Sequence, residues 1–419
     1  MDILLKEVTV IDPASDFHQQ QVDVFVQNGF LTEIGEIERP SDQTISLRGL
    51  HVSPGFTDVF AHFCDPGFEF RETLESGAMS AAYGGYTDVL VVPNTAPVVH
   101  QKSGVSYIIQ QSTNLPVTLH PIGAVSKNAE GKELAEMYDM YHSGAVAFGD
   151  GTSPLQSSGI LLKALQYVKA IDKTIIQLPD DHSISAGGLM NEGIASTRLG
   201  LPGKPAIAEE LMIRRDIELA KYTGSKLHIT GVSSAKGIEC IRKAKEDGLQ
   251  VTCSVTPAHL YFSDEDLAGY DTNLKLLTPL RTKADRQALR EAVLDGTVDC
   301  IASHHIPHHS DNKVVEFEYA RPGMISLETA FSVVRTSLPS LSLGQLIPLF
   351  STTPREIFGL QPVSVAKGNA ASLSLFFPHK QWIPESFFSR SKNSPFTGLQ
   401  LTGLPVGIIN RDKVILRSL

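Results

Sequence analysis

The middle of the chain alternates between short apolar runs and longer amphipathic stretches. Runs rich in Val, Ile and Leu predict buried parallel strands, and stretches with a helical period predict the helices between them. The strands are predicted at 87–92, 117–122, 145–148, 174–178, 226–229, 250–255 and 298–302. The helices are predicted at 132–142, 159–171, 206–222, 234–247 and 283–294. Seven or eight such units over about 300 residues favour a closed (β/α)8 TIM barrel, with an open doubly wound sheet as the alternative.

The two ends of the chain have a different pattern. Residues 2–11, 22–26 and 30–34 alternate or run apolar and are broken by a turn signal, Asn28-Gly29. Residues 371–377 and 407–409 are similar and lie among Pro, Gly and Asn. We therefore predict that residues 1–53 and 362–419 pair into a small β-sandwich domain and that residues 54–361 form the barrel.

Composition excludes several classes of protein. The chain has 419 residues, 42 % of them hydrophobic and 20 % charged, as is usual for a globular protein. A net charge of −10 without a basic stripe argues against a nucleic-acid surface. The N-terminus does not resemble a signal peptide, and no apolar run reaches the roughly 18 residues of a membrane span. The four cysteines lack CxxC spacing, which is typical of reduced thiols and favours a cytoplasmic location.

Candidate chemistry lies just after the predicted strands, where the functional groups of such barrels gather. Residues 54–67 hold one histidine, His62, and Phe60 stands two residues before it. Two histidines at that spacing would face the same side of a strand and could bind one cation, but a lone histidine is more often a core or surface residue. Asp150, in Phe-Gly-Asp-Gly, fits a metal bridge or an ordinary Asp-Gly turn equally well.

The segment 301–309 carries four histidines in six residues. They suggest a metal site, yet His304 and His305 face opposite ways if the chain is extended, and Pro307 interrupts the run. His228 and His259 also lie near strand ends, where each taken alone is a structural residue. Phosphate-binding glycine loops, nucleophile elbows and dinucleotide fingerprints are absent from the sequence.

Ordered landmarks along the whole chain resemble one family. They are Pro54-Gly-Phe-Thr-Asp, Asp65-Pro-Gly-Phe-Glu-Phe-Arg-Glu-Thr, Gly84-Gly-Tyr-Thr, Val92-Pro-Asn-Thr, Met190-Asn-Glu-Gly, Leu199-Gly-Leu-Pro-Gly, Ala208-Glu-Glu, His228-Ile, Val255-Thr-Pro, Pro279-Leu-Arg, Asp295-Gly-Thr-Val-Asp and Ser391-Lys-Asn-Ser-Pro-Phe-Thr-Gly. From about residue 1 to residue 415 the chain resembles the long-chain bacterial dihydroorotases of the amidohydrolase superfamily. The resemblance implies a hydrolase of pyrimidine biosynthesis that interconverts dihydroorotate and carbamoyl aspartate with one or two zinc ions.

The chain departs from the family at most of the metal positions. Where the resemblance implies histidine ligands, Phe60, Gln177 and Gly231 stand instead, while His62 and Asp150 keep the family's residue types. Phe and Gly cannot bind zinc, and Gln is a poor ligand beside His. The two vestigial ligands are too few for a zinc site of three or four protein ligands.

The substrate and catalytic positions are changed as well. Cys64 stands where the family has a carboxylate-binding Arg, Leu277 where it has a substrate-contacting Asn, and His304 where it has the catalytic Asp. Asn94 and His308 keep their places as remnants of the substrate pocket. Loss of the Asp removes the base that accepts the water proton, and Cys cannot replace a bidentate guanidinium.

We interpret these departures as those of a non-catalytic dihydroorotase-like protein, a pseudoenzyme with a structural or regulatory role and no expected cofactor. The resemblance implies aspartate carbamoyltransferase as the first partner to test, and a homodimer. An alternative is a cyclic amidohydrolase that binds one zinc ion at a remodelled site built from His62, Asp150 and His304 with His259, His305 and His308. A third reading is a small-molecule binding module, in which Phe60 and Leu277 make the pocket apolar while Asn94 and His308 bind a carboxylate.

Overall fold

The larger part of the protein is a parallel barrel. The computed structural model describes residues 2–418. Eight parallel strands follow one another around the barrel in chain order. They are β6 (Phe56–Ala61), β7 (Tyr86–Val91), β8 (Thr118–Gly123), β9 (Ala147–Phe148), β10 (Ile175–Gln177), β13 (Leu227–Ile229), β14 (Val251–Val255) and β15 (Cys300–Ile301). The predicted barrel is therefore confirmed, and each predicted strand lies within two residues of an observed one.

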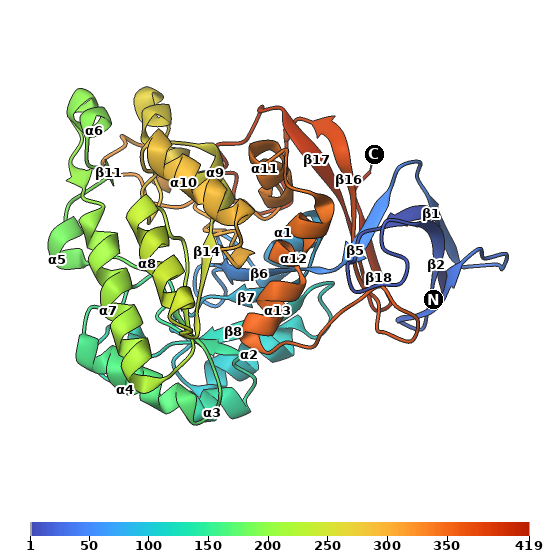
Figure 1. The fold of residues 1–419 in the computed structure, drawn as a ribbon, viewed down its shortest axis with the longest axis horizontal. Coiled ribbons are helices and arrows are strands. Elements are labelled where there is room, and N and C mark those ends of the chain that lie inside the picture. Colours follow the sequence, from blue (N-terminus) through green and yellow to red (C-terminus); the bar gives the residue numbers. More distant parts are fainter. Residues whose placement is uncertain (1, 419) are drawn as a thin grey trace.

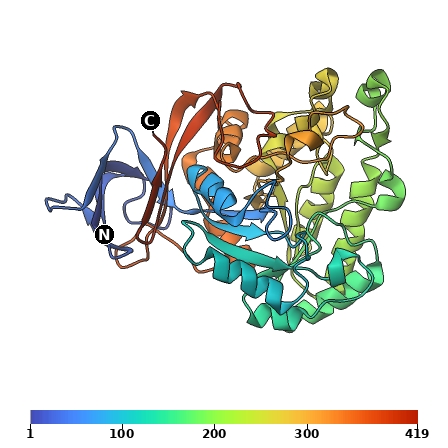
Figure 2. The same cartoon turned by 180° about the vertical axis from the view of Figure 1, so that it is seen from behind.

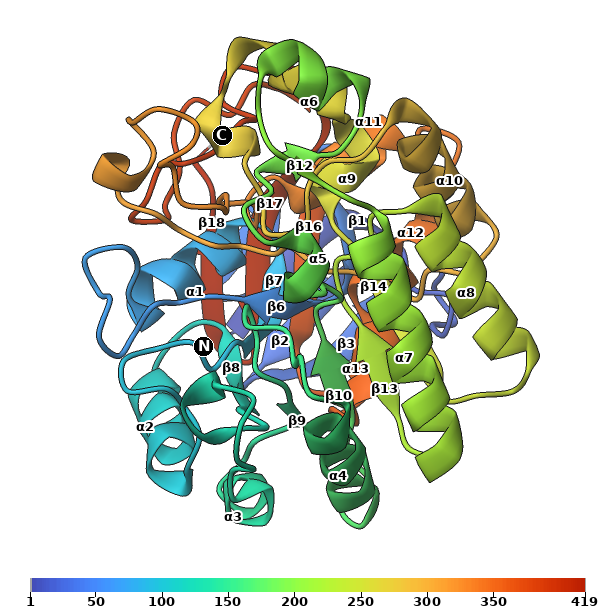
Figure 3. The same cartoon turned by 90° about the vertical axis from the view of Figure 1, so that its left-hand side faces the viewer.

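Helices surround these strands (Figure 3). Those of the barrel ring are α1 (Leu74–Tyr83), α2 (Lys102–Ser112), α3 (Met137–His142), α4 (Ser158–Lys169), α7 (Ile207–Thr223), α8 (Ala235–Glu246), α10 (Lys283–Leu294), α11 (Ala330–Ser337), α12 (Leu343–Phe350) and α13 (Thr352–Phe358). Shorter elements lie in the connections: α5 (His182–Ser185), β11 (Met190–Asn191), α6 (Ile194–Leu199), β12 (Gly203–Lys204) and α9 (Pro257–Tyr261). The strong amphipathic period of α10 explains why its predicted bounds, 283–294, agree with the structure.

The predicted helix at 132–142 is wrong in its first half. The helix α3 starts only at Met137, because the residues before it pair with the loop after β8. The backbone N–H of Lys127 donates to Glu133 and that of Ala135 to Val125. These hydrogen bonds with the loop after β8 replace the ones that a helix would have made within residues 132–136.

The barrel closes where β6 meets the chain that follows β15. The N–H of His62 donates to the carbonyl oxygen of His305 at 2.8 Å, and Ala61 and His305 form a parallel bridge. Below this point the carboxylate of Asp58 accepts both the N–H and the hydroxyl of Ser303, at 2.6 and 2.8 Å. We call these contacts the closing seam. They rule out the open doubly wound sheet.

The strands of the two chain ends form one further sheet, in the order β18-β17-β16-β5-β1-β2-β3 with β4 beside β1. Their bounds are β1 (Asp2–Val10), β2 (Gln21–Gln27), β3 (Phe30–Gly35), β4 (Gln43–Ser46), β5 (His51–Pro54), β16 (Ser372–Trp382), β17 (Leu401–Asn410) and β18 (Lys413–Leu416). Figures 1 and 2 show these strands, blue and red, side by side at one end of the barrel. The pairing predicted between the two chain ends is thus confirmed.

Aromatic side chains join the sheet to the barrel. Phe56 of β6, Phe331 of α11, Phe350 of α12 and Phe376 of β16 are fully buried, with ring centroids 4.9–6.1 Å apart in the contacting pairs. Rings of this size bury a large apolar area, which holds the two parts in a fixed position. No helix in the described part of the chain is both long and apolar enough to cross a membrane.

Candidate functional site

The retained histidine at the end of β6 has no free ring nitrogen. Nδ1 of His62 accepts the backbone N–H of Cys64 at 2.9 Å, and Nε2 lies 3.0 Å from the carbonyl oxygen of Asn94. Because a carbonyl can only accept, Nε2 carries the proton in this arrangement and the ring is neutral. Burial lowers the pKa of His62 to about 3, which agrees with a neutral ring. A metal would need one of these lone pairs, and neither is available.

Asp150 is held by a serine in the loop after β8. One of its carboxylate oxygens accepts the backbone N–H of Ser126 at 2.9 Å, and the other binds the Ser126 hydroxyl. The residue also forms the predicted turn, because Gly151 has φ +58° and Ser153 N–H donates to the Asp150 carbonyl. Burial raises the pKa of the Asp150 carboxyl to about 6.

The amide of Asn94 is bound to the same turn. Its Nδ2 donates to the carbonyl oxygen of Asp150 at 3.0 Å, and its Oδ1 accepts the N–H of Thr152 at 2.8 Å. Both ends of the amide are therefore engaged within the protein. Asn94 thus braces the loop after β9, and its side chain is not free to bind a carboxylate as the third reading expected.

Two rings stack at positions where the resemblance to dihydroorotases implies metal-site residues. The side chains of Phe60 and His304 stack with centroids 4.4 Å apart and an angle of 28° between their planes. His304 Nε2 is hydrogen bonded to the Thr230 hydroxyl at 2.8 Å, and burial lowers the pKa of His304 to about 3. Gly231 leaves the room for this ring, since an ideal Cβ on Gly231 would lie 2.5 Å from Cε1 of His304. Three changed positions, Phe60, Gly231 and His304, are thus parts of one packing arrangement.

His304 and His305 point to different partners, as expected, but the reason differs from the predicted one. The backbone at His304 is not extended; its φ is +46°. The His304 ring turns into the barrel, and the His305 ring turns towards α1, where its Nε2 lies 3.4 Å from Glu72. Nδ1 of His305 accepts the N–H of Ser326 at 3.2 Å. The histidine cluster of the sequence is therefore divided between two environments.

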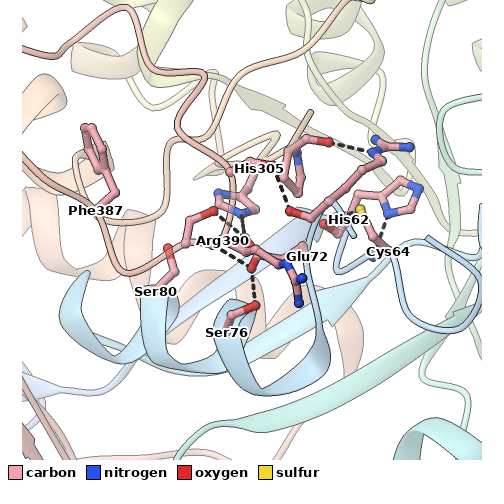
Figure 4. Close-up of polar contacts among 12 residues, drawn as sticks. His62, Cys64, Glu72, Ser76, Ser80, His305, Phe387 and Arg390 are labelled. Carbon is pink, nitrogen blue, oxygen red and sulfur yellow. Dashed lines mark hydrogen bonds and ion pairs between the residues drawn. The ribbon is translucent and has the colours of Figure 1, made fainter. Parts of the chain in front are cut away.

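A buried carboxylate holds the outside of the seam. Glu72 precedes α1 and accepts hydrogen bonds from the hydroxyls of Ser76 and Ser389, from the N–H of Arg390 at 2.9 Å and from His305 (Figure 4). Burial acts to raise the pKa of Glu72, but the contacts with His305 and the serines outweigh it, and the pKa is lowered. We call this set the Glu72 clasp. It connects α1, the chain after β15 and the segment 389–390.

The remaining family positions are also engaged or enclosed. Gln177 is buried, and its Nε2 donates to Asp216 at 3.2 Å. Burial raises the pKa of the Cys64 thiol to about 12, which makes it a poor nucleophile and a poor metal ligand. Leu277 lines a cavity at the barrel mouth, beside His304, that has a volume of only about 20 Å³. That is room for about one water molecule.

The other histidines near strand ends are buried and hydrogen bonded within the protein. His228 lies between the hydroxyls of Thr252 and Ser254, at 2.9 and 3.1 Å. His259 contacts the Thr256 hydroxyl at 2.7 Å, and its Nε2 faces a carbonyl oxygen at 3.1 Å. His308 is buried at the outer side of the mouth, with Nε2 donating to the carbonyl oxygen of Pro322 at 3.0 Å.

These donor atoms do not fit the zinc that the fold family implies. Within residues 2–418, no group of three or more His, Cys, Asp or Glu side chains is placed to hold a metal ion. A catalytic zinc site needs three protein ligands with free lone pairs converging on one point. His62 and Asp150 instead direct their donor atoms to backbone and serine groups, so no step can be derived through a metal.

Comparisons with known proteins agree with the sequence landmarks. A family model described as Dihydro-orotase-like matches residues 49–237. The dihydroorotase of Syntrophus aciditrophicus is 39 % identical over 99 % of this chain and 99 % of its own length. That of Ruminiclostridium cellulolyticum is 40 % identical over 97 % of this chain and 96 % of its own. The chain belongs to the dihydroorotase family.

The fold also matches solved structures of hydantoinases. The L-hydantoinase of Arthrobacter aurescens superimposes with a TM-score of 0.87 over 99 % of this chain and 96 % of that chain, at 24 % identity. A D-hydantoinase gives a TM-score of 0.85 at 21 % identity. At these identities the likeness establishes the shared fold alone.

The structure brings together some of the residues that family membership singled out, and it separates others. Phe60, His62 and His304 meet at the closing seam, whereas His308 lies outside it. Sequence reasoning missed Glu72 and Ser126 as the partners that engage His305 and Asp150. Glu72 lay within a quoted landmark, so its buried position could have been suspected, but Ser126 stands in a loop without any signal.

Substituting Gly231 tests the ring packing. Gly231→Ala should destabilise the protein by about 2–4 kcal/mol, because left-handed backbone disfavours a Cβ and His304 already occupies its place. Gly200→Ala is the matched control, since φ is +66° there and nothing lies within 4 Å of the added carbon. Urea unfolding measures both. Equal losses in the two variants would show that His304 does not fill the space.

The raised pKa of Asp150 predicts a pH dependence of stability. A carboxyl with a folded-state pKa of about 6 and an ordinary value of 3.8 stabilises the fold when protonated. Its contribution is therefore lost as pH rises from about 4 to 6. Asp150→Asn removes this loss. Relative to the wild type, the free energy of unfolding of the variant should therefore rise by up to about 3 kcal/mol between pH 4 and pH 7. Denaturant titrations at both pH values measure it; the exposed Asp412→Asn should follow the wild type.

The Glu72 clasp has the opposite dependence. Its folded-state pKa lies below the ordinary 4.5, so its stabilisation is present above that value and is lost as pH falls through the folded pKa. Glu72→Gln should cost about 3 kcal/mol at pH 7 and less at low pH, because the buried carboxylate accepts four hydrogen bonds and an amide cannot accept all of them. Glu75→Gln on the exposed side of α1 should stay within about 0.5 kcal/mol. A cost independent of pH would contradict the assignment.

Proposed function

We propose that this member of the dihydroorotase family does not hydrolyse a cyclic amide and keeps the barrel for a structural or regulatory role. The observation that carries the proposal is the closing seam. Phe60 and His304 are stacked at the family's metal position, and both ring nitrogens of His62 are hydrogen bonded. The barrel is preserved, but the ring nitrogens of His62 are used in hydrogen bonds within the protein.

The chemistry of the family needs groups that this chain does not offer. A metal-bound water attacks near neutral pH only if neutral imidazoles and carboxylates hold the cation, and a nearby base must accept its proton. Thiol at Cys64 and hydrocarbon at Leu277 replace the groups that would bind the substrate's polar atoms. The cavity beside His304, about 20 Å³, is also far below the ~300 Å³ at which ligand pockets begin. A neighbouring hollow lined by Leu277, Asp180 and Lys204 measures about 280 Å³.

The curated relatives carry the name dihydroorotase, so turnover is the competing expectation and can be measured directly. The purified protein, supplied with zinc, should form no carbamoyl aspartate from dihydroorotate and hold less than stoichiometric zinc, nickel or manganese by elemental analysis. The Syntrophus aciditrophicus dihydroorotase, prepared in the same way, is the control. One firmly bound zinc with turnover that is lost in both His304→Ala and Asp150→Asn would instead support the remodelled mononuclear site.

Aspartate carbamoyltransferase is the partner we propose first, and a homodimer is the assembly we propose for the chain itself. A role without turnover requires a binding surface, and one is offered by large apolar side chains on the outer side of α6 and α7. Ile194, Leu211 and Tyr222 are 74, 42 and 78 % exposed. Figure 1 places these helices at the edge of the barrel remote from the chain-end sheet. We propose these side chains as the contact with the partner, since apolar groups on protein surfaces are the usual material of such contacts.

A pull-down from native extract tests the partner. The tagged full chain should retain aspartate carbamoyltransferase, and Leu211→Asp together with Tyr222→Asp should abolish the retention, because burying a carboxylate in the contact is unfavourable. Ile383→Asp, on an exposed apolar residue after β16, is the matched control and should bind normally. Absence of the transcarbamoylase from the wild-type eluate would remove this partner while leaving the prediction of inactivity intact.

A further inference from the structure

A groove outside the barrel mouth has the size of a ligand site. It lies between Phe70 in the loop after β6, residues 270–273, residues 308–310 and 313–314, and residues 390–393, and its volume is about 580 Å³. Sites for small molecules measure about 300–1,000 Å³ and are largely formed before binding. The groove is separate from the 20 Å³ cavity beside Leu277. Of the metal, catalytic and substrate positions that the resemblance implies, only His308 lines it, although Phe70 and residues 391–393 belong to the family's sequence landmarks.

The floor of the groove is rigid. The ammonium of Lys313 donates to the carbonyl oxygens of Thr272, Arg321 and Gly323, at 2.6, 2.9 and 3.0 Å. The buried amide of Asn393 accepts the N–H of His308 at 3.0 Å and donates to Gly323 at 3.1 Å. These bonds connect three loops, so the shape of the groove does not depend on a ligand to order it. A preformed site avoids the entropy cost of ordering loops on binding.

The rim is apolar and aromatic. Phe70, Tyr270 and Val314 line the groove and are 54, 46 and 83 % exposed. The Phe70 ring meets the His309 ring edge to face, with centroids 6.5 Å apart. Several large apolar side chains gathered around one concave surface indicate a binding site rather than the scattered exposure of an ordinary surface. A flat ring is the shape that such walls accommodate, since aromatic pairs add about 0.5–1.5 kcal/mol to burial.

The charge of the groove is positive in a chain whose net charge is −10. Arg390 and Lys392 line it, and among the described lining residues Asp271 is the only acid. Lys313 lines it too, but burial lowers the pKa of its ammonium to about 7, so it carries only part of a charge near neutral pH. Lys392 already donates to two carbonyl oxygens, those of Phe387 and Ser389. The guanidinium of Arg390, by contrast, makes no hydrogen bond or ion pair with any side chain or backbone group in residues 2–418, although its backbone N–H is held by Glu72.

A fixed backbone with an unpaired guanidinium is a suitable anchor for an anion. Guanidinium presents a planar fork of N–H groups that matches carboxylate and phosphate oxygens. We infer that the groove binds a small aromatic anion, a flat ring bearing a carboxylate or a phosphate, with its charge on Arg390 and its ring against Phe70 and Val314. The inference goes beyond the proposed function, because the groove lies outside the barrel mouth and would bind whether or not the barrel hydrolyses.

Isothermal titration calorimetry on the full chain tests this site with defined probes. Benzoate and phenyl phosphate distinguish the two kinds of head group, benzylamine reverses the charge, and inorganic phosphate lacks the ring. Saturable binding of benzoate or phenyl phosphate, one per chain, is expected. Benzylamine and inorganic phosphate should bind at least tenfold more weakly, because each lacks one of the two contacts.

Two variants assign the binding to the groove. Arg390→Gln should weaken the better aromatic anion about tenfold, and Phe70→Ala should weaken the aromatic anions without changing the response to inorganic phosphate. Arg411→Gln, an exposed arginine at the turn between β17 and β18, makes the same change in net charge and should have no effect. Because both arginines are exposed, neither arginine substitution should change the unfolding midpoint of the protein.

Three results would overturn the inference. One is the absence of saturable binding by either aromatic anion at millimolar concentration. Another is an equal loss in Arg390→Gln and Arg411→Gln, which would mean that net charge alone attracts the probe. The third is saturation by an acidic peptide such as polyglutamate while both aromatic anions fail to bind, which would assign the groove to a protein partner instead.

Discussion

The closing seam between β6 and the chain after β15 is the contact on which the rest of the structure depends. A (β/α)8 barrel has no free edge only if its last strand reaches its first. Here that closure uses the backbone pair His62–His305 and the buried carboxylate of Asp58 on Ser303. Burial raises the pKa of Asp58 to about 6, so even this structural carboxylate is sensitive to its surroundings. Hydrogen bonds of Asp58 and His62, the stacked rings of Phe60 and His304, and the Glu72 clasp on His305 thus all lie at the closing seam.

The same seam accounts for the ring packing at the barrel mouth. In a barrel of this type the first and last strands place their side chains at the mouth, where a cation would normally collect them. Phe60 cannot coordinate a cation and instead offers a ring face, which His304 covers from the last strand. Gly231 then has to be small, because the His304 ring extends over it. The changed residues thus support one another, and restoring a single ligand would leave the others in its way.

Several features could be predicted from the chain because they depend on local pattern. Hydrophobic periods located the barrel strands to within two residues, and ordered landmarks identified the family over its length. The helix at 132–142 was half wrong because pairing of the Val125–Lys127 loop with a segment 6–10 residues ahead overrides local propensity. Asn94 was expected to face substrate, but its amide is used by the Asp150 turn, a contact 56 residues away in sequence.

The sequence by itself determined the fold class and the family, and it predicted positions at which the residue type differs from that of a metal hydrolase. These depend on residue identity and on spacing along one segment, both of which are visible in a chain. Only the tertiary structure decided what the changed residues do: that His62 has no free nitrogen, that Phe60 and His304 stack over Gly231, and that Arg390 stands unpaired beside an apolar groove. Each of these is a relation between segments far apart in the chain, and such relations exist only once the barrel has closed.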